Sequence, residues 1–203
     1  HSAMTRITFA IATVLSLAFT PLAALDKATG GGEIVILDLV ATERMSVGKL
    51  DSCELTYLIA YEDYIYRNGA ITLLRGSMNF AGFTSASDKG PAYLFKVTAF
   101  DVVGNEPYLA PLKYAYLSSK SSSYAGKEYV IGAAEDGGIL VGYDAFAHFG
   151  LIFTDPISLN ITREGGNSDV SIPIDLMTYN QVTSLQHTEC VLKLIDVLRD
   201  KFN

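Results

Sequence analysis

Apolar and polar residues alternate with a period of two over most of the chain between Glu33 and Leu176. Such alternation is typical of β-strands with one buried face. The strands expected in this region, in chain order, are 53–61, 64–67, 70–73, 93–99, 127–133, 139–143, 157–162 and 170–176. Before them, 33–42 is a nearly continuous apolar run, which suits a strand buried on both faces or a short core segment. Several short strands at this spacing predict a mainly β fold, an antiparallel β-sandwich or a small barrel.

Local turn signals divide this pattern into hairpins. The turn sequences are Asn68-Gly69, 134–138 and 164–167, and each lies between two of the expected strands. Asn-Gly between alternating segments is the strongest short-range hairpin signal. Pro173 lacks a backbone N–H, so it predicts that the last strand lies at a sheet edge or carries a bulge.

The period becomes helical near the C-terminus. Apolar residues recur at helical spacing from about Ser184 to Phe202, which predicts one α-helix over 184–202. Thr183 or Ser184 can cap its start, with Gln186 as the capping-box partner of Thr183. We expect this C-terminal helix to pack on one face or one open end of the β-structure.

The first 24 residues have the pattern of a secretory signal peptide. After an expression scar over 1–3, Arg6 supplies a positive charge, 7–19 form an apolar run, and 20–24 end in small residues. We expect cleavage after Ala24, which leaves 25–203 as a single β-rich domain. Two alternatives stay open for this hydrophobic leader: a transmembrane anchor, for which it is marginal in length, or a buried core helix.

The cysteine count agrees with export, because exported chains with an even number of cysteines usually pair them. Cys53 begins the more apolar face of a predicted strand, and Cys190 borders the apolar stripe of the predicted helix. A Cys53–Cys190 disulfide would tie the helix to the sheet. Two buried free thiols are the alternative, and a pair of Cys190 with His187, three residues earlier on the same helix face, is a third.

Composition and charge exclude several classes. The chain has 203 residues, 49% of them hydrophobic and 18% charged, which excludes a disordered chain. The net charge of −7 argues against nucleic-acid binding, because no surplus of cations is available to neutralise phosphates. Two Cys and three His cannot build a structural zinc site of the usual spacing, and we expect no metal and no cofactor.

The usual catalytic motifs are absent from the sequence. His148, with Asp144 or Asp155 nearby, could form an acid–base pair, although a loop histidine bonded to a backbone carbonyl is the plainer interpretation. The acidic turns 135–138 and 167–169 offer oxygen ligands for a hard cation. Neither turn spaces its acids like a calcium loop, so ordinary turn chemistry explains them.

Tyrosine is over-represented among the aromatic residues, with twelve Tyr and no Trp. Four of them lie within ten residues: Tyr57, Tyr61, Tyr64 and Tyr66. An apolar ring with a polar tip suits a contact surface, which makes this group a candidate binding surface. The high strand propensity of tyrosine explains the same cluster without any binding role.

Together these patterns predict an exported protein, periplasmic or secreted, that works by binding and not by catalysis. Its partner would be an envelope protein bound through protein–protein contacts. One alternative is a carrier of a small apolar ligand in a β-barrel-like cavity, and a second is a hydrolase that uses His148 with Asp144 or Asp155. We expect membrane contact only through an uncleaved leader, and an attached leader would also favour a homo-oligomer, because its apolar surface has to be covered.

Overall fold

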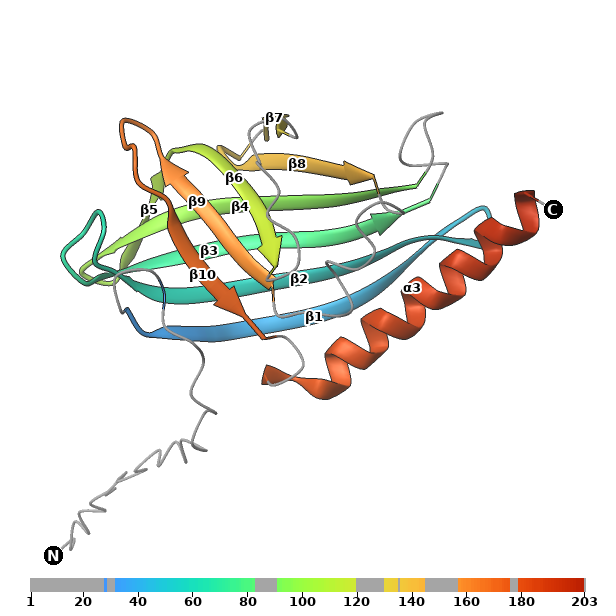
Figure 1. The fold of residues 1–203 in the computed structure, drawn as a ribbon. Helices are drawn as coiled ribbons and strands as arrows, with labels where there is room; N and C mark the ends of the chain where they lie inside the picture. The colour runs from blue at the N-terminus through green and yellow to red at the C-terminus, as the bar shows by residue number, and fades with distance from the viewer. Residues whose placement is uncertain are drawn as a thin grey trace, which may run out of the picture.

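The fold is mainly β, as predicted: two antiparallel sheets form a sandwich, with one C-terminal helix packed beside it (Figure 1). The structure is a computed structural model, and it describes residues 28, 32–82, 91–119, 130–134, 136–144, 157–175 and 179–202. The predicted signal peptide lies outside the described residues.

The larger sheet, sheet A, contains seven of the described strands in the order β1-β2-β3-β4-β8-β7, with β5 also paired to β4. Its strands are β1 (Ile34–Ser46), β2 (Lys49–Asp63), β3 (Ala70–Ala81), β4 (Ala92–Val103), β5 (Glu106–Ala110), β7 (Val130–Ala133) and β8 (Ile139–Asp144). Sheet B has the order β10-β9-β6, with β6 (Leu112–Ser119), β9 (Ile157–Arg163) and β10 (Val170–Ile174). Pro173 therefore lies on an edge strand of sheet B, as its missing N–H predicts.

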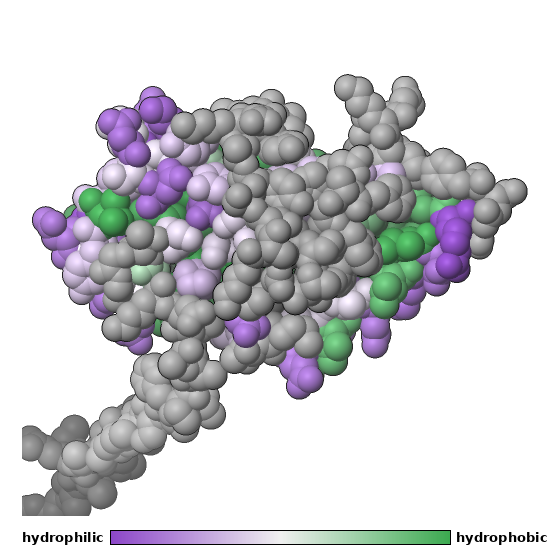
Figure 2. All heavy atoms as spheres, in the orientation of Figure 1, coloured by the Kyte–Doolittle hydropathy of each residue, from purple (hydrophilic) through white to green (hydrophobic). Residues whose placement is uncertain are grey.

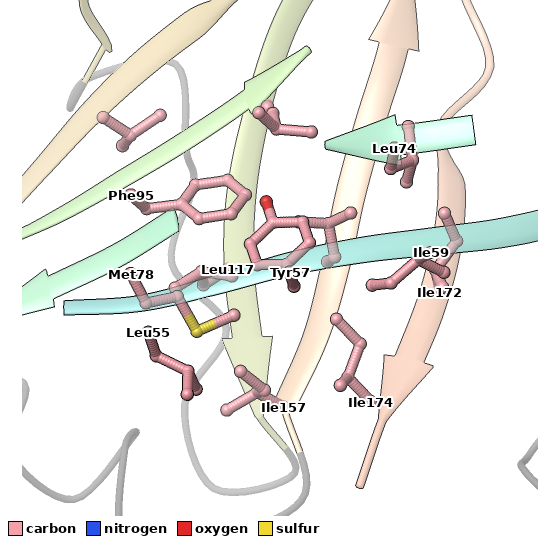
Figure 3. Close-up of a cluster of buried hydrophobic side chains, with 14 of the residues drawn as sticks. Leu55, Tyr57, Ile59, Leu74, Met78, Phe95, Leu117, Ile157, Ile172 and Ile174 are labelled. Atoms are coloured by element: carbon pink, nitrogen blue, oxygen red, sulfur yellow. The ribbon is translucent and has the colours of Figure 1, made fainter. Parts of the chain in front are cut away.

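The core lies between the inner face of sheet A and sheet B. In β2 the odd-numbered residues from Cys53 to Tyr61 are all buried, and the residues between them are partly exposed, as the alternation predicts. Figure 3 shows side chains of both sheets meeting in this space, where the rings of Tyr57 and Phe95 are stacked with their centroids 6.5 Å apart. The labelled side chains are Leu55, Tyr57 and Ile59 of β2, Leu74 and Met78 of β3, Phe95 of β4, Leu117 of β6, Ile157 of β9, and Ile172 and Ile174 of β10.

One expected strand is a turn. Residues 64–67 do not extend β2, because the chain folds back directly after Asp63. Asp63 Oδ1 accepts hydrogen bonds from the backbone N–H groups of Ile65 and Tyr66, at 3.1 and 2.8 Å. Its carbonyl oxygen accepts two more, from the N–H groups of Arg67 and Gly69. These bonds satisfy the backbone locally and stop the strand.

Helix α3 (Gln181–Phe202) packs on β1 and β2, and begins three residues before the predicted start. The cap is Asn180, whose Oδ1 accepts a hydrogen bond from the N–H of Thr183 at 3.1 Å, and not Thr183 or Ser184. Cys190, Val191, Leu194 and Leu198 are buried on its inner side. Its exposed side alternates apolar and charged residues, visible along the lower right of Figure 2. Among the described helices, none is long and apolar enough to cross a membrane.

The predicted disulfide is present: Cys53 of β2 is bonded to Cys190 of α3, with their Cα atoms 5.8 Å apart. The two residues are 137 positions apart in the sequence, so the bond closes a loop that includes most of the described chain. Both cysteines are fully buried among apolar residues of the core.

Reduction of this bond should lower the free energy of unfolding by about 4–5 kcal/mol, because it releases a very long loop in the unfolded chain. Urea unfolding of the oxidised protein, of the reduced protein and of the Cys53→Ala/Cys190→Ala variant measures the effect. The reduced protein and the double variant should agree within about 1 kcal/mol. Equal stability of the oxidised and reduced proteins would contradict a stabilising role.

Candidate functional site

The four tyrosines of the predicted contact surface do not share one surface. Tyr57 and Tyr61 are buried in the core, where burial raises the pKa of both hydroxyls above the usual value. Tyr64 is half exposed in the turn after β2. Tyr66 is partly buried, and its hydroxyl donates a hydrogen bond to the backbone carbonyl of Ser168. A contact role for Tyr64 and Tyr66 stays a prediction.

The predicted acid–base pair is not tested by the structure. His148 and Asp155 lie outside the described residues, and of Asp144, the last residue of β8, only the backbone is described. The described acids of the two turns are engaged by neighbours: Asp136 pairs with Lys96 at 2.8 Å, and Asp169 accepts hydrogen bonds from Tyr116 and Thr162. Within the described part of the chain, no three His, Cys, Asp or Glu side chains gather as metal ligands would.

A buried ionic cluster joins the two sheets at one end of the sandwich. Arg163, the last residue of β9, reaches from sheet B to sheet A, where its Nη2 lies 2.7 Å from Asp63 Oδ2 and 2.7 Å from Asp101 Oδ1. The same nitrogen donates to Thr72 Oγ1 at 2.7 Å. Arg67 is the second cation, with its Nε 3.5 Å from Asp101 Oδ1. Sequence reasoning missed this cluster because its members are far apart in the chain.

The charges of the cluster balance internally, although the buried Nε of Arg163 has no hydrogen-bond partner among the described residues. Burial alone would lower the pKa of Arg163, but hydrogen bonding to Asp101 and the charges of Asp101 and Asp63 raise it above its usual value. Burial would likewise raise the pKa of Asp101, yet Arg163 and Arg67 hold it below its usual range. Tyr66 covers the guanidinium, with the Arg163 Cζ 5.5 Å from the ring centroid. Two arginines and two aspartates balance in charge, which supports a structural role for this cluster.

His187, which the sequence suggested only as a possible partner of Cys190, is a buried polar residue. It lies on the inner side of α3, one turn before Cys190, and neither ring nitrogen has a hydrogen-bond partner among the described residues. Burial lowers its pKa to about 4, because a charged imidazolium here would lose its hydration without compensation. His187 and Cys190 do not form a catalytic pair, since Cys190 is in the disulfide.

The tip of the β1–β2 hairpin is the most exposed apolar feature among the described residues. Val47 is 99% exposed and Met45 is 61% exposed. Val47 and Gly48 form the turn with φ values of 50° and 73°, both in the left-handed region. That pair of angles is the one for which hairpins select Asn-Gly, and a β-branched residue is disfavoured there. Figure 1 shows this tip beside the C-terminal end of α3, away from sheet B.

The outer face of sheet A carries a shallow groove of about 320 Å³. Strands β1 to β4 and the turn before β8 contribute its walls, which are mixed in charge and rich in hydroxyl groups. At its rim the guanidinium of Arg75 lies over the ring of Phe100, with Cζ 5.9 Å from the ring centroid. The lining residues are Asp38, Glu54, Thr56, Tyr57, Leu58, Arg75, Gly76, Ser77, Lys96, Thr98 and Asp136.

Comparison of the chain with protein-family models, with curated proteins and with solved structures finds no match.

Replacement of Arg163 by Met should lower the free energy of unfolding by about 3–5 kcal/mol, because it leaves the fully buried Asp63 carboxylate without its cation. Asp63→Asn in the same chain should recover part of this loss. The matched control is Arg199→Met, which breaks an exposed Arg–Asp pair on α3 and should cost less than about 1 kcal/mol. Equal losses in the two single variants, measured by urea unfolding, would show that the cluster is not stabilising.

His187 should make stability fall as pH falls between about 6.5 and 4. In this interval the unfolded chain binds a proton at His187 that the folded protein does not, whereas above it both states are neutral. Between pH 6.5 and 4, the His187→Phe variant should therefore lose roughly 3 kcal/mol less of its unfolding free energy than the wild type does. Unfolding curves for both proteins at a series of pH values give the difference. Parallel pH profiles would mean that His187 is not buried as a neutral group.

Proposed function

We propose that this protein is an exported, non-enzymatic binding protein that inserts the tip of its β1–β2 hairpin into an apolar pocket of a protein partner. The observation that carries the proposal is Val47, a β-branched apolar residue that is 99% exposed in a left-handed backbone conformation. A residue that is unfavourable both for the turn and for solvation is best explained by a contact that the isolated chain does not make.

No contact within the described chain offsets the free-energy cost of placing valine at position 47. The left-handed conformation costs an L-residue roughly 1–2 kcal/mol, and Asn or Gly would avoid most of that cost. At 99% exposure the Val47 side chain gains almost nothing from packing. Its neighbour Met45 is also exposed, and a flexible thioether beside a rigid branched side chain suits an apolar pocket.

The base of the hairpin is held rigidly, which favours binding by the tip. Glu43 of β1 is the register partner of Cys53, so the disulfide anchors β2 at that position. Glu43 also pairs with Lys193 of α3 at 3.1 Å, and Arg44 pairs with Glu54 across the hairpin. A pre-ordered tip loses less conformational entropy on binding than a mobile one.

Two further observations support export from the cytoplasm and a binding role. A disulfide is typical of proteins of oxidising compartments outside the cytoplasm, which agrees with the signal-peptide pattern of the leader. The interior that the described residues line between the sheets is packed with side chains (Figure 3), which favours a binding protein over a carrier of an apolar ligand.

The substitution Val47→Asn should raise the free energy of unfolding by about 1 kcal/mol and weaken partner binding at least tenfold. Stability and binding would then move in opposite directions, which a purely structural residue cannot produce. The partner is found by placing a photo-reactive amino acid at position 47, with Val182 on the exposed side of α3 as the matched control position.

A protein cross-linked from position 47 and not from 182 is then purified, and its affinity for the wild-type chain and for V47N is measured by calorimetry. Tighter binding by the wild type supports the proposal. Equal affinity of the two chains, or identical adducts from both positions, contradicts it.

A further inference from the structure

The outer face of sheet A carries an apolar row that no described helix or strand covers, because sheet B and α3 both pack on the inner face. The strand register places five apolar residues opposite one another on five neighbouring strands. Residues that are directly opposite in a sheet point to the same face. The apolar row, in order from β1 to β5, consists of Val35, Ala60, Leu73, Phe100 and Leu109.

The exposure of the apolar row agrees with an open face. All five of its residues are partly or fully exposed, and Leu109 is 49% exposed. Ile71, two residues before Leu73 on β3 and therefore on the same face, is 40% exposed. A contiguous apolar surface of this kind marks a contact with another molecule.

The apolar row is unequal in size between its two halves. Its residues on β1 and β2 are small, Val35 and Ala60, and those on β3 and β4 are large, Leu73 and Phe100. Consider two copies packed face to face about a two-fold axis that runs along the strands between β2 and β3. Strand β1 of one copy then lies over β4 of the other, and β2 lies over β3. Each large side chain meets a small one, which is the condition for close packing between two sheets.

The same axis also matches opposite charges. Asp38 of β1 is exposed and has no hydrogen-bond or ionic partner among the described residues. Arg75 of β3 leans toward β4, where its Cζ lies 5.9 Å from the ring centroid of Phe100, and its contact with Asp136 is 4.0 Å long. Because β4 of one copy lies over β1 of the other, this direction carries the guanidinium of Arg75 toward Asp38 of the second copy. The two-fold axis repeats the pair, so the contact contains it twice.

The area of the outer face is sufficient for a dimer. Strands β1 to β4 each have at least 12 residues. At about 4.8 Å between strands and about 3.3 Å per residue, four such strands present a face of roughly 750 Å². A specific interface of standard size buries about 800 Å² on each partner. The shallow groove lies on this face over the rows rich in hydroxyl groups, and water fills it as in the polar part of other interfaces.

We propose that the protein forms a two-fold symmetric dimer through the outer faces of sheet A. Val35 and Ala60 of one copy pack on Phe100 and Leu73 of the second copy, and Asp38 pairs with Arg75. A second copy fits this face because one axis matches both the sizes and the charges, and such self-complementarity is what an isologous interface requires. Since polar groups flank the apolar row, the dissociation constant of the dimer is on the order of 10 µM.

The test is sedimentation velocity of the full chain over a series of concentrations. Asp38→Arg and Arg75→Asp should each weaken the dimer at least tenfold, because each brings like charges together twice in the interface. The double variant Asp38→Arg/Arg75→Asp exchanges the two charges and should recover most of the affinity. The matched controls, Asp196→Arg and Arg199→Asp, reverse the charges of an exposed pair on α3 and should leave the dimer unchanged.

The substitution Ala60→Glu tests the apolar row, and it should also weaken the dimer at least tenfold, because it places a charge against Leu73 of the second copy. Urea unfolding shows that each variant is folded. A wild-type chain that stays monomeric at about 200 µM, far above the expected dissociation constant, overturns the proposal. Association that Ala60→Glu and the single reversals leave unchanged, or that the double variant does not recover, overturns it as well. Val47 is outside this face, so these outcomes are independent of the hairpin proposal.

Discussion

The buried carboxylate of Asp63 organises one end of this fold. Its side chain is fully buried, so it has to find donors and a cation inside the protein. Through one oxygen it binds the backbone of Ile65 and Tyr66, which determines the turn between β2 and β3. Through the other it binds Arg163, which determines how sheet B meets sheet A. A single ionised group thus specifies both a local turn and a contact between two sheets.

The opposite end of sheet A is held by different chemistry. There α3 packs its apolar side on β1 and β2, and the covalent bond from Cys53 to Cys190 holds it in place. Ionic and covalent constraints therefore act at two separated places, with the apolar core between them. The hairpin tip that is proposed to bind a partner lies outside the core, so it can present exposed apolar side chains without disturbing the core.

Much of this architecture could be predicted from the sequence, because the features concerned are local or periodic. Alternation located most strands, and the turn at 134–138 predicted the β7–β8 hairpin correctly. The disulfide followed from the inward side of one strand and the inner stripe of the helix. The β1–β2 hairpin was missed because Val47-Gly48 does not have the residues that its backbone angles favour.

The candidate sites were harder to predict, because they depend on residues distant in the chain. Nothing local links Asp63 to Arg163 until the strand order and register are known. The tyrosine cluster shows the converse, since Tyr57 and Tyr64 are near in sequence but one is in the core and the other at the surface. Which side chains share a surface can be predicted only when the strand register is known.

The position of the disulfide also determines how the protein responds to mechanical force. A pull on the C-terminus can unwind only the part of α3 that follows Cys190, because the bond then passes the load to β2. β2 has hydrogen-bonded neighbours on both sides, β1 and β3, with pairings that extend over most of its length. Tension therefore shears two long ladders at once, and the sandwich resists extraction from its C-terminal end far better than the exposed helix suggests.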